Sequence, residues 1–382
     1  SGLVGALAWD SVREVENLPN RKPMAYEVPV LNFILMRNLL VFDHQLSRIQ
    51  VVSNLFIEGQ TEAELRDDYN SALEQLQLLK TQLAEPSVSY LAELTAVVTV
   101  DAKPNHTQQS FAKTVAQAQV HVQAGDVFQV VVSQRFDRET QSSPLDIYRA
   151  LRSINPSPYM YHINLSDTSG VYSIVGSSPE ALVKVFDGQA IMHPIAGSKP
   201  RGKTFEEDIE LAEVLLSDEK ERAEHLMLVD LARNDLLKVC NPKTVNVTEF
   251  MKIHKFSHIQ HLVSTVEGNL NDDSTVVDVF RATFPAGTLS GAPKPRALEI
   301  IDDLENENRG LFGGVVGYFD FAGNADLAIA IRTALMRDGV AHVQAGAGIV
   351  LDSDATSEFN ETKSKAAVIL HAVDVAESLR RV

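Results

Sequence analysis

Long apolar segments follow one another without a helix between them over residues 313–350, where glycines separate runs such as GGVVGYFDF and AGAGIV. The stretch from Val171 to Ile195 has the same character and predicts three strands separated by Gly or Asp turns. Strands joined this closely pair in antiparallel fashion, because a parallel pair needs a crossover of about a dozen residues or more. Helical patterns come in groups, over 205–236 and 275–304, rather than in alternation with strands. The order of elements therefore predicts an α+β fold with large antiparallel sheets.

The first part of the chain carries a weaker pattern. Gly2 to Trp9 predicts a short buried strand, and two apolar runs within 28–52 predict adjacent strands of a large sheet. Residues 61–83 place leucines and a tyrosine at helical spacing, which predicts an amphipathic helix. The polar stretch 84–107 is expected to connect this region to the rest of the chain. The length of 382 residues fits one large domain or two ordinary ones.

The charge and composition exclude several classes of function. The formal net charge is −17, which argues against a nucleic-acid partner, since such binding requires clustered Lys and Arg. No run of about 18 apolar residues is present, so no membrane-spanning helix is expected. Cys240 is the single cysteine, which excludes an intramolecular disulfide and a cysteine-based zinc site and predicts a reducing, cytoplasmic compartment. The sequence also lacks the signatures of dinucleotide-binding enzymes and zinc proteases.

Two Glu-x-x-Glu motifs are the first candidates for chemistry: Glu221 with Glu224, and Glu358 with Glu361. Carboxylates three residues apart share one face of a helix, and each face here continues into a partly apolar stripe that would turn the pair inward. Inward carboxylates repel one another unless a cation lies among them. Mg²⁺ suits a few carboxylates, water molecules and an anionic substrate. The alternative is two ordinary solvated acidic helix faces.

Two loops rich in Gly, Pro and cations are the second candidates: HPIAGSKPRG (193–202) and FPAGTLSGAPKPR (284–296). Glycine allows close approach to the backbone, whose N–H groups can hold oxyanions. Thr288, Ser290 and Lys294 add donors to the second loop. Neither loop matches the P-loop pattern, and a pair of tight structural turns is the alternative.

Four single residues stand out by their surroundings. Glu180 follows a proline in SSPEAL and would serve as a general acid if burial raised its pKa; otherwise it is a solvated turn residue. His261 lies within an apolar segment, where a satisfied core histidine is the alternative to a functional one. Arg332, inside the apolar strand AIAIRTAL, requires a carboxylate from the protein or from a ligand. Tyr318, on the preceding strand, adds a hydroxyl.

Taken in order, several long motifs resemble those of the chorismate-utilising enzymes, which include anthranilate, aminodeoxychorismate, isochorismate and salicylate synthases. The motifs are DVFQVVVSQRF, NPSPYMYHINL, IVGSSPEALVKV, HPIAGSKPRG, EKERAEHLMLVDLARNDL, FPAGTLSGAPKPRALEII, GGVVGYFDF and AGAGIVLDSDATSEFNETKSKA, and they span roughly 110–375. The resemblance implies one chorismate-binding catalytic domain over 1–382, with its core motifs in 106–378. It also implies that the antiparallel sheets pack as a two-layered core with flanking helices.

Two positions distinguish branches of this family. Members that add water to chorismate carry a lysine base where this chain has Gln129, so ammonia is the expected nucleophile. Aminodeoxychorismate synthases read PIKGT where this chain reads PIAGS, with Ala196. The chain is therefore most similar to the anthranilate synthase branch, which converts chorismate and ammonia to anthranilate and pyruvate through aminodeoxyisochorismate in tryptophan biosynthesis. Open alternatives are an enzyme that stops at aminodeoxyisochorismate, an aminodeoxychorismate synthase, and a non-catalytic regulator that binds chorismate or tryptophan.

The resemblance also implies roles for individual residues. Mg²⁺ is the expected cofactor, with Glu224 and Glu361 as direct ligands and Glu221 and Glu358 in the same shell or acting through water. Glu180 is expected to protonate the departing C4 hydroxyl, His261 to act in the elimination of pyruvate, and Lys365 to support the metal carboxylates. Arg332, Tyr318 and the backbone N–H groups near Gly346 and Gly348 are expected to bind the enolpyruvyl carboxylate of chorismate. The ring site is expected to be lined by Thr288 and His261, with Gln129, Ala196 and Gly197 as further site residues.

Further expectations concern regulation and partners. Members of this branch carry a long region before the segment that resembles GLVG, so residues 1–105 are expected to be the remainder of a truncated N-terminal region. One half of a tryptophan feedback site resembles NPSPYMYH, which implies a partial regulatory site at Asn155, Pro156, Tyr159 and Met160. Ammonia is expected from a glutamine amidotransferase partner, which implies a hetero-oligomer in the full-length form.

Overall fold

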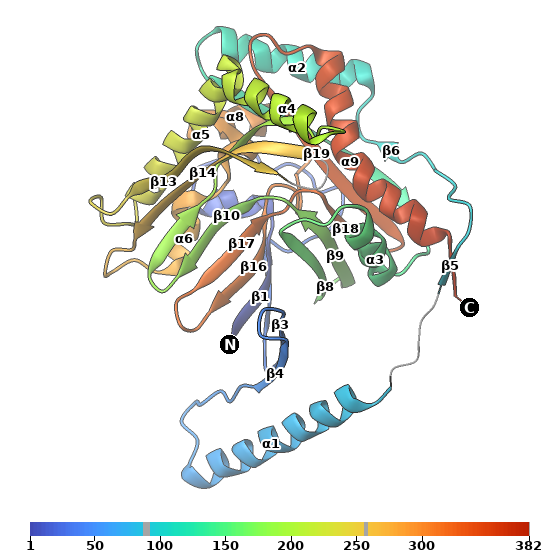
Figure 1. Cartoon of the computed structure of the whole chain (residues 1–382), viewed down its shortest axis with the longest axis vertical. Coiled ribbons are helices and arrows are strands. Elements are labelled where there is room, and N and C mark those ends of the chain that lie inside the picture. The colour runs from blue at the N-terminus through green and yellow to red at the C-terminus, as the bar shows by residue number, and fades with distance from the viewer. Residues whose placement is uncertain (87–91, 256–258, 382) are drawn as a thin grey trace.

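Two antiparallel sheets form the body of the protein in the computed structural model, which describes residues 1–86, 92–255 and 259–381 (Figure 1). The larger sheet has nine strands among these residues, in the order β12–β14–β11–β10–β17–β16–β1–β2, with β13 paired to β14. Its strands are β1 (Gly2–Leu7), β2 (Leu31–Leu35), β10 (Ala181–Phe186), β11 (Gln189–Met192), β12 (Ile195–Pro200), β13 (Asn246–Lys255), β14 (Ile259–Asn269), β16 (Val315–Asp320) and β17 (Ala325–Ile329).

The second sheet has seven strands in the described ranges, in the order β15–β7–β19–β18–β9–β8, with β6 paired to β7. Its strands are β6 (Lys103–Pro104), β7 (Gln129–Glu139), β8 (Tyr159–Asp167), β9 (Gly170–Ser178), β15 (Gly291–Ala292), β18 (Thr333–Arg337) and β19 (Val340–Ile349). Two short pairings lie outside both sheets: β3 (Asn38–Asp43) with β4 (Arg48–Ser53), and β5 (Ala92–Leu94) with β20 (Leu379–Arg381).

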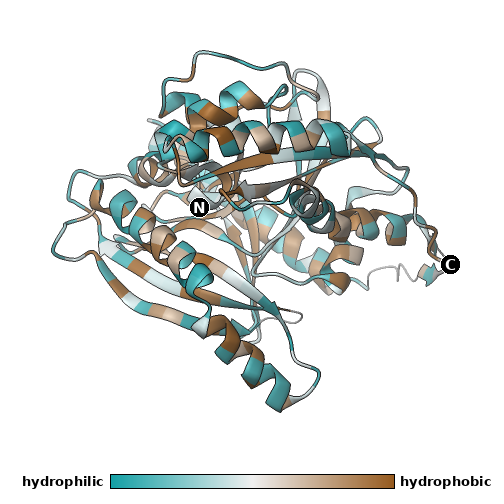
Figure 2. Ribbon diagram, turned by 90° about the horizontal axis from the view of Figure 1, so that it is seen from above, coloured by the Kyte–Doolittle hydropathy of each residue, from teal (hydrophilic) through white to brown (hydrophobic). Residues whose placement is uncertain are grey.

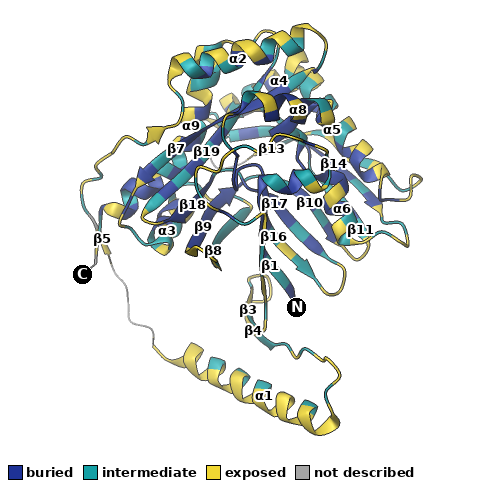
Figure 3. Ribbon diagram, turned by 180° about the vertical axis from the view of Figure 1, so that it is seen from behind, coloured by how far each residue is buried: buried dark blue, intermediate teal, exposed yellow. Residues whose placement is uncertain are grey.

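Helices cover the outer faces of the sheets, and those in the top view carry both hydrophilic and hydrophobic stretches (Figure 2). The α-helices of the described ranges are α1 (Glu62–Ala84), which lies apart from the sheets (Figure 3), α2 (Gln108–Gln123), α3 (Pro144–Ile154), α4 (Phe205–Ser217), α5 (Glu219–Leu237), α6 (Val276–Thr283), α7 (Gly287–Ser290), α8 (Lys294–Leu304) and α9 (Ala355–Glu377), with a 3₁₀ helix at Trp9–Glu14. Within the described ranges, no helix combines the length and the apolar character needed to cross a membrane.

The core lies between the sheets and beneath the helices. Between the sheets, Val316 of β16 packs in one cluster with Ile174 of β9 and Leu335 of β18. On the outer face of the second sheet, side chains such as Val343 pack against Ile369 of α9. The prediction of an α+β fold with a two-layered antiparallel core and flanking helices is confirmed.

Two local predictions are wrong. The apolar runs of 28–52 do not all join the large sheet: β2 pairs with β1, but β3 and β4 pair only with each other in the described structure. The glycine-containing segment 193–202, expected as a loop, instead contains strand β12, because it finds hydrogen-bonding partners along β14. A register shift between Ala196 and Ser198 accommodates Gly197, whose φ of 69° lies in the left-handed region.

The predicted helix over 61–83 forms as α1, and its first turn is fixed by a capping box between Thr61 and Glu64. None of its residues is buried. Figure 3 shows α1 almost entirely as exposed ribbon, apart from the sheets and joined to them through the β3–β4 hairpin. The helix is thus set by its local sequence, and its apolar stripe contributes little packing.

Candidate active site

Glu180 lies between β9 and β10, where the backbone is held from both sides. The Ile329 N–H donates to the Glu180 carbonyl at 3.0 Å, and the Ser178 hydroxyl donates to the Ile329 carbonyl at 2.7 Å. The Thr288 hydroxyl of α7 donates to Glu180 Oε1 at 3.0 Å. Burial raises the pKa of the Glu180 carboxyl to about 7, against the Thr288 bond and the charge of Lys365, which lower it. A carboxyl group with this pKa can hold a proton near neutral pH and release it to a bound molecule.

His261 faces the same region from β14. Its Nδ1 lies 3.0 Å from the carbonyl oxygen of Gly197. Because a carbonyl only accepts, Nδ1 carries the proton and Nε2 of the neutral ring has the lone pair. Burial lowers the pKa of His261, and the charge of Arg332 adds to this effect while the Gly197 bond opposes it. The ring is therefore held neutral and able to accept a proton at Nε2.

Arg332 is a partly buried cation on a strained backbone. The expectation that it stands inside a strand is wrong, because it lies at a bend between the end of β17 at Ile329 and the start of β18 at Thr333. Its φ is 49°, in the left-handed region, which is uncommon for a residue with a side chain. The carbonyl of Arg332 accepts from the Ser177 N–H at 3.1 Å, which holds this conformation. Burial lowers the pKa of Arg332, and the nearby charge of Glu361 opposes that shift. Strain that is kept in this way is typical of binding sites, where it aims a side chain.

Lys365 of α9 ties this helix to the second sheet. Its Nζ donates to the Gly346 carbonyl of β19 at 2.9 Å and lies 2.5 Å from Glu361 Oε1. Further along β19, a Cβ added at Gly348 would lie 2.1 Å from Nε2 of Gln129. The amide of Gln129 therefore lies against the backbone of β19 at Gly348, and a side chain at that position would displace it.

The two carboxylate pairs lie at the starts of α5 and α9. Burial raises the pKa of Glu221, and the negative charge of Glu224 raises it further. Burial also raises the pKa of Glu358, and the charge of Glu361 acts in the same direction. Lys220 lowers the pKa of both Glu221 and Glu358, so the two helix starts are close enough to share its charge. At both Glu221 and Glu358, burial and the neighbouring carboxylates outweigh the charges of the nearby lysines, which fits a site for an added cation.

Two findings limit that fit. In the ranges that the structure describes, no group of three or more His, Cys, Asp or Glu side chains gathers closely enough to hold a metal ion. Glu361 is about half exposed and bonded to Lys365. The oxygen donors therefore have the right chemistry for Mg²⁺, while the four-glutamate ligand set stays a prediction.

Ala196 and Gly197 of the predicted substrate site are close to these groups. Ala196 pairs with Leu262, the neighbour of His261. A Cβ on Gly197 would lie 3.1 Å from Glu221 Oε2. The structure thus brings Glu180, Thr288, His261, Gly197, Arg332, Gln129, Gly346, Gly348, Lys365 and the carboxylate pairs into one connected region.

Tyr318 has different neighbours. It lies opposite Asp326 in the pairing of β16 with β17, and burial together with the charges of Asp326 and Asp320 raises its pKa. Tyr159 joins this group, since burial and its bond to Asp326 raise its pKa as well. These surroundings are acidic, and the expected place of Tyr318 beside a substrate carboxylate stays a prediction.

The partial regulatory site lies at the start of β8. Asn155 ends α3 and accepts a hydrogen bond at its carbonyl from the Ser177 hydroxyl at 2.5 Å. After Pro156, Tyr159 and Met160 pair with Ser178 and Ser177 of β9. The segment therefore borders the strand end that leads to Glu180, and its regulatory role stays a prediction.

Sequence reasoning missed Lys220, whose charge reaches both carboxylate pairs. The signal was present in EKERAEH, where a lysine directly precedes Glu221 near the helix start. The proximity of Lys220 to Glu358 depends on how α5 and α9 meet, which no local pattern reports.

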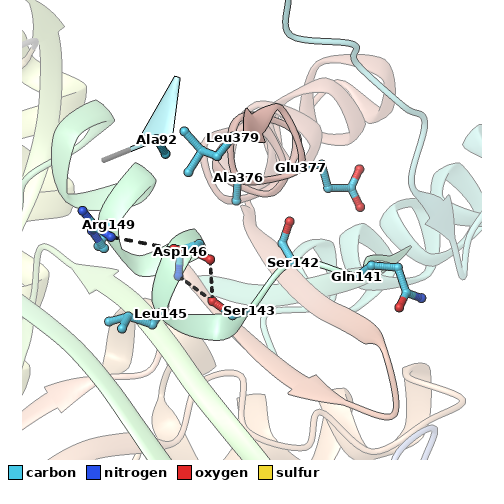
Figure 4. Close-up of a pocket in the computed structure, with 10 residues that line it drawn as sticks. All are labelled: Ala92, Gln141, Ser142, Ser143, Leu145, Asp146, Arg149, Ala376, Glu377 and Leu379. Atoms are coloured by element: carbon cyan, nitrogen blue, oxygen red, sulfur yellow. Dashed lines mark hydrogen bonds and ion pairs between the residues drawn. The ribbon is translucent and has the colours of Figure 1, made fainter. Parts of the chain in front are cut away.

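A cavity of about 870 Å³ lies away from these residues (Figure 4). It is formed by the start of α3, the end of α9 and the β5–β20 pairing, with Ser143, Asp146, Arg149 and Glu377 on its walls. None of the predicted site residues lines it. A smaller cavity of about 40 Å³ does include Glu180 and Thr288, together with apolar side chains of α5.

The family model of the chorismate binding enzymes matches residues 1–371. The chain belongs to this family. It is 49% identical over 381 residues to anthranilate synthase component 1 of Mycolicibacterium smegmatis, covering 99% of this chain and 72% of that relative. The component of the same name from Arthrobacter globiformis is 48% identical over 386 residues, covering 100% of this chain and 73% of the relative.

A solved structure supports the same placement within the chorismate binding enzymes. Anthranilate synthase component I from Streptococcus pneumoniae has a TM-score of 0.87 and 38% identity, covering 97% of this chain and 80% of that one. The resemblance to the anthranilate synthase branch is confirmed, and the chain is an enzyme of the chorismate-utilising family.

Proposed function

We propose that the chain is the large subunit of an anthranilate synthase, a Mg²⁺-dependent lyase that converts chorismate and ammonia to anthranilate and pyruvate. The observation that carries the proposal is the partly buried Glu180 carboxyl, whose pKa burial raises to about 7 and which accepts a hydrogen bond from Thr288. Identity of up to 49% with anthranilate synthase components supports it. The proposal takes the chain as one catalytic domain.

In the first step, Glu180 donates its proton to the C4 hydroxyl of chorismate, which then leaves as water. A hydroxyl group is a poor leaving group without such a proton. Ammonia forms the new bond at C2, which gives aminodeoxyisochorismate. Gln129, which lies against Gly348, provides no base to activate water in competition with ammonia.

In the second step, His261 removes the proton from C2 while the C3–O bond breaks, and the ring becomes aromatic. The enolpyruvyl group leaves as the enolate of pyruvate, which takes up a proton at its methylene carbon to give pyruvate. The Gly197 carbonyl holds Nδ1, so Nε2 is the acceptor for the proton from C2. Burial keeps the ring neutral by lowering its pKa, which a general base requires.

The charged residues of the site suit a dicarboxylate. Arg332, a partly buried cation, would bind one carboxylate of chorismate. Glu221, Glu224, Glu358 and Glu361 would hold Mg²⁺, which when bound supplies positive charge for the other carboxylate. Lys365 keeps Glu361 in place through their ion pair.

The first test is an assay of the purified chain with chorismate, Mg²⁺ and ammonium at alkaline pH, with the products separated by chromatography. Anthranilate plus pyruvate is the expected result. Accumulated aminodeoxyisochorismate would instead assign the chain to enzymes that stop at this intermediate, and 4-amino-4-deoxychorismate would assign it to the aminodeoxychorismate synthases. Bound but unconsumed chorismate would contradict the enzymatic proposal and favour a regulator.

The same assay with glutamine tests the partner. We propose that a glutamine amidotransferase subunit delivers ammonia to this chain. Glutamine should support turnover only when such a subunit is added, whereas ammonium should support it without one. Equal rates with and without an added amidotransferase in glutamine would contradict the partner assignment.

A further inference from the structure

Each carboxylate pair is followed directly by a polar residue that is completely buried. His225 comes after Glu224 in α5, Thr362 comes after Glu361 in α9, and both have 0% exposure. Each of them hydrogen-bonds to a polar side chain of the sheet below that is also 0% exposed. His225 Nε2 lies 2.6 Å from Ser264 Oγ, and Gln134 Nε2 donates to Thr362 Oγ1 at 2.5 Å.

The two hydrogen bonds join the helices to different sheets. Ser264 belongs to β14 of the larger sheet, and its hydroxyl oxygen also accepts from the Met251 N–H at 2.9 Å. Gln134 belongs to β7 of the second sheet, where its neighbour in the pairing is Ala345, next to Gly346. Figure 1 shows α5 and α9 over separate parts of the sandwich. The two carboxylate pairs are therefore located by two independent attachments.

These polar pairs are poor choices for packing alone. His225 Nδ1 and Gln134 Oε1 are buried without a hydrogen-bond partner among the described residues. An unsatisfied buried polar atom destabilises the fold, and apolar residues of the same shape would avoid this loss. The sequence keeps directional hydrogen bonds at both places, so a role in orientation accounts for them better than a role in stability.

A hydrogen bond at one helix position fixes the direction of the next. Successive residues of an α-helix differ in direction by about 100°. When His225 is held toward β14, the direction of Glu224 is set, and Thr362 sets the direction of Glu361 in the same way. Helix rotation would otherwise carry each carboxylate away from the other pair.

We propose that the His225–Ser264 and Thr362–Gln134 hydrogen bonds are positioning contacts that orient the two glutamate pairs toward a shared divalent cation. The proposal rests on the metal site of the proposed function and adds residues that never touch the metal. Contacts behind metal ligands of this kind commonly change metal affinity by about 10- to 100-fold when they are removed.

The test measures chorismate-dependent Mn²⁺ binding by electron paramagnetic resonance, without ammonium so that no turnover occurs. The main variant is Gln134→Leu with Thr362→Val, which removes both polar partners and keeps the apolar packing. Its Kd for Mn²⁺ should rise by about tenfold or more. Thr362→Ser, which keeps the hydroxyl, should bind Mn²⁺ like the parent chain. Tyr172→Phe is the matched control, since it removes a partly buried hydrogen bond to Asn32 far from both helices.

Thermal unfolding of the same samples separates orientation from stability. We expect the Gln134→Leu/Thr362→Val variant to lose much of its Mn²⁺ affinity while it unfolds at a temperature close to that of the parent chain. A folded double variant with unchanged Mn²⁺ affinity would overturn it. If the double variant does not fold, Ser264→Ala tests the α5 contact by the same measurement of Mn²⁺ affinity. Unchanged Mn²⁺ affinity in a folded Ser264→Ala variant would also overturn the proposal. Absence of Mn²⁺ binding by the parent chain would instead remove the metal site itself, and this inference with it.

Discussion

Thr288→Val should shift the pH dependence of the first chemical step toward higher pH. The Thr288 hydroxyl donates one hydrogen bond of 3.0 Å to Glu180 and so stabilises the ionised carboxylate. Such bonds to charged groups contribute about 1.5 to 3 kcal/mol. Protonated Glu180 keeps a weaker hydrogen bond to Thr288. The bond therefore favours the ionised form over the protonated form by an energy near the lower end of that range. One pKa unit corresponds to about 1.4 kcal/mol, so the pKa should rise by about one unit.

The size of the effect follows from the fraction of Glu180 that carries a proton. A general acid is active in its protonated form, so the rate falls as the pH rises above its pKa. Burial raises this pKa to about 7. At about pH 8, roughly a tenth of the parent chain would be protonated, against roughly half of the variant. The variant should therefore keep about five times more of its own plateau rate at that pH.

The assay is kcat/KM for chorismate measured across pH, with total ammonium adjusted so that free ammonia stays constant. Without that adjustment, the titration of ammonium would mask the fall in rate at high pH that reports the deprotonation of Glu180. Ser290→Ala is the matched control, because its hydroxyl lies in the same loop but donates to the Ala286 carbonyl. If kcat/KM of the variant fell at the same pH as that of the parent chain, or at a lower pH, Glu180 would not be the acid whose pKa Thr288 lowers.

Three further substitutions test the site and its support. Glu180→Gln should lower kcat by at least about a hundredfold while calorimetry still detects chorismate binding; normal turnover would exclude the acid role. Glu361→Ala should abolish Mg²⁺-dependent turnover, because the cation loses a ligand, and undiminished activity would exclude the metal assignment. Lys294→Met leaves Asp235 without its buried partner at 2.7 Å and should destabilise the fold by about 3 to 5 kcal/mol in denaturant unfolding. Adding Asp235→Asn should recover much of that loss of stability. Additive losses from the two substitutions would contradict the view that the unpaired charge of Asp235 causes it.

Elements with local signals were predictable from the sequence. Thr61 and Ser143 occupy N-cap positions, and Pro144 follows at the first helical position, so α1 and α3 begin where the chain marks them. The spacing of Glu221 and Glu224 likewise placed both on one helix face before any tertiary contact was known.

Pairing partners were not predictable, because they depend on residues far along the chain. The segment 196–200 contains glycine and proline and still forms β12, since β14 offers it a partner. The hairpin of β3 and β4 has the apolar pattern of a sheet strand but pairs only locally in the described structure. Strand propensity measures fit to a neighbour, which a single segment does not contain.

The candidate site divides in the same way. Glu180 and Arg332 could be identified as candidates from their residue types and neighbours in the sequence. The pKa of Glu180 could not be predicted, because it depends on burial in the fold. The backbone conformation of Arg332 could not be predicted either, because it is held by a hydrogen bond from Ser177. The buried contacts of His225 and Thr362 carried no signal, because a lone polar residue in an apolar stripe is most often a satisfied core residue. Its importance becomes visible only when its partner on the sheet is known.

The charges around the site predict that metal and chorismate bind together. In the proposed site the glutamates of both pairs would lie near a dicarboxylate substrate. Their charges are opposed by nearby cations, namely Arg332, Lys365, Lys220 and Lys199. The net charge of −17 adds a repulsive field for an anion. Coupling between two ligands is reciprocal and commonly amounts to about 5- to 150-fold. Chorismate should therefore bind at least about tenfold more weakly in EDTA than in Mg²⁺ when titrated by calorimetry. Equal affinity in both buffers would mean that the protein's own cations balance the substrate, and the four glutamates would then need another explanation than a shared metal ion.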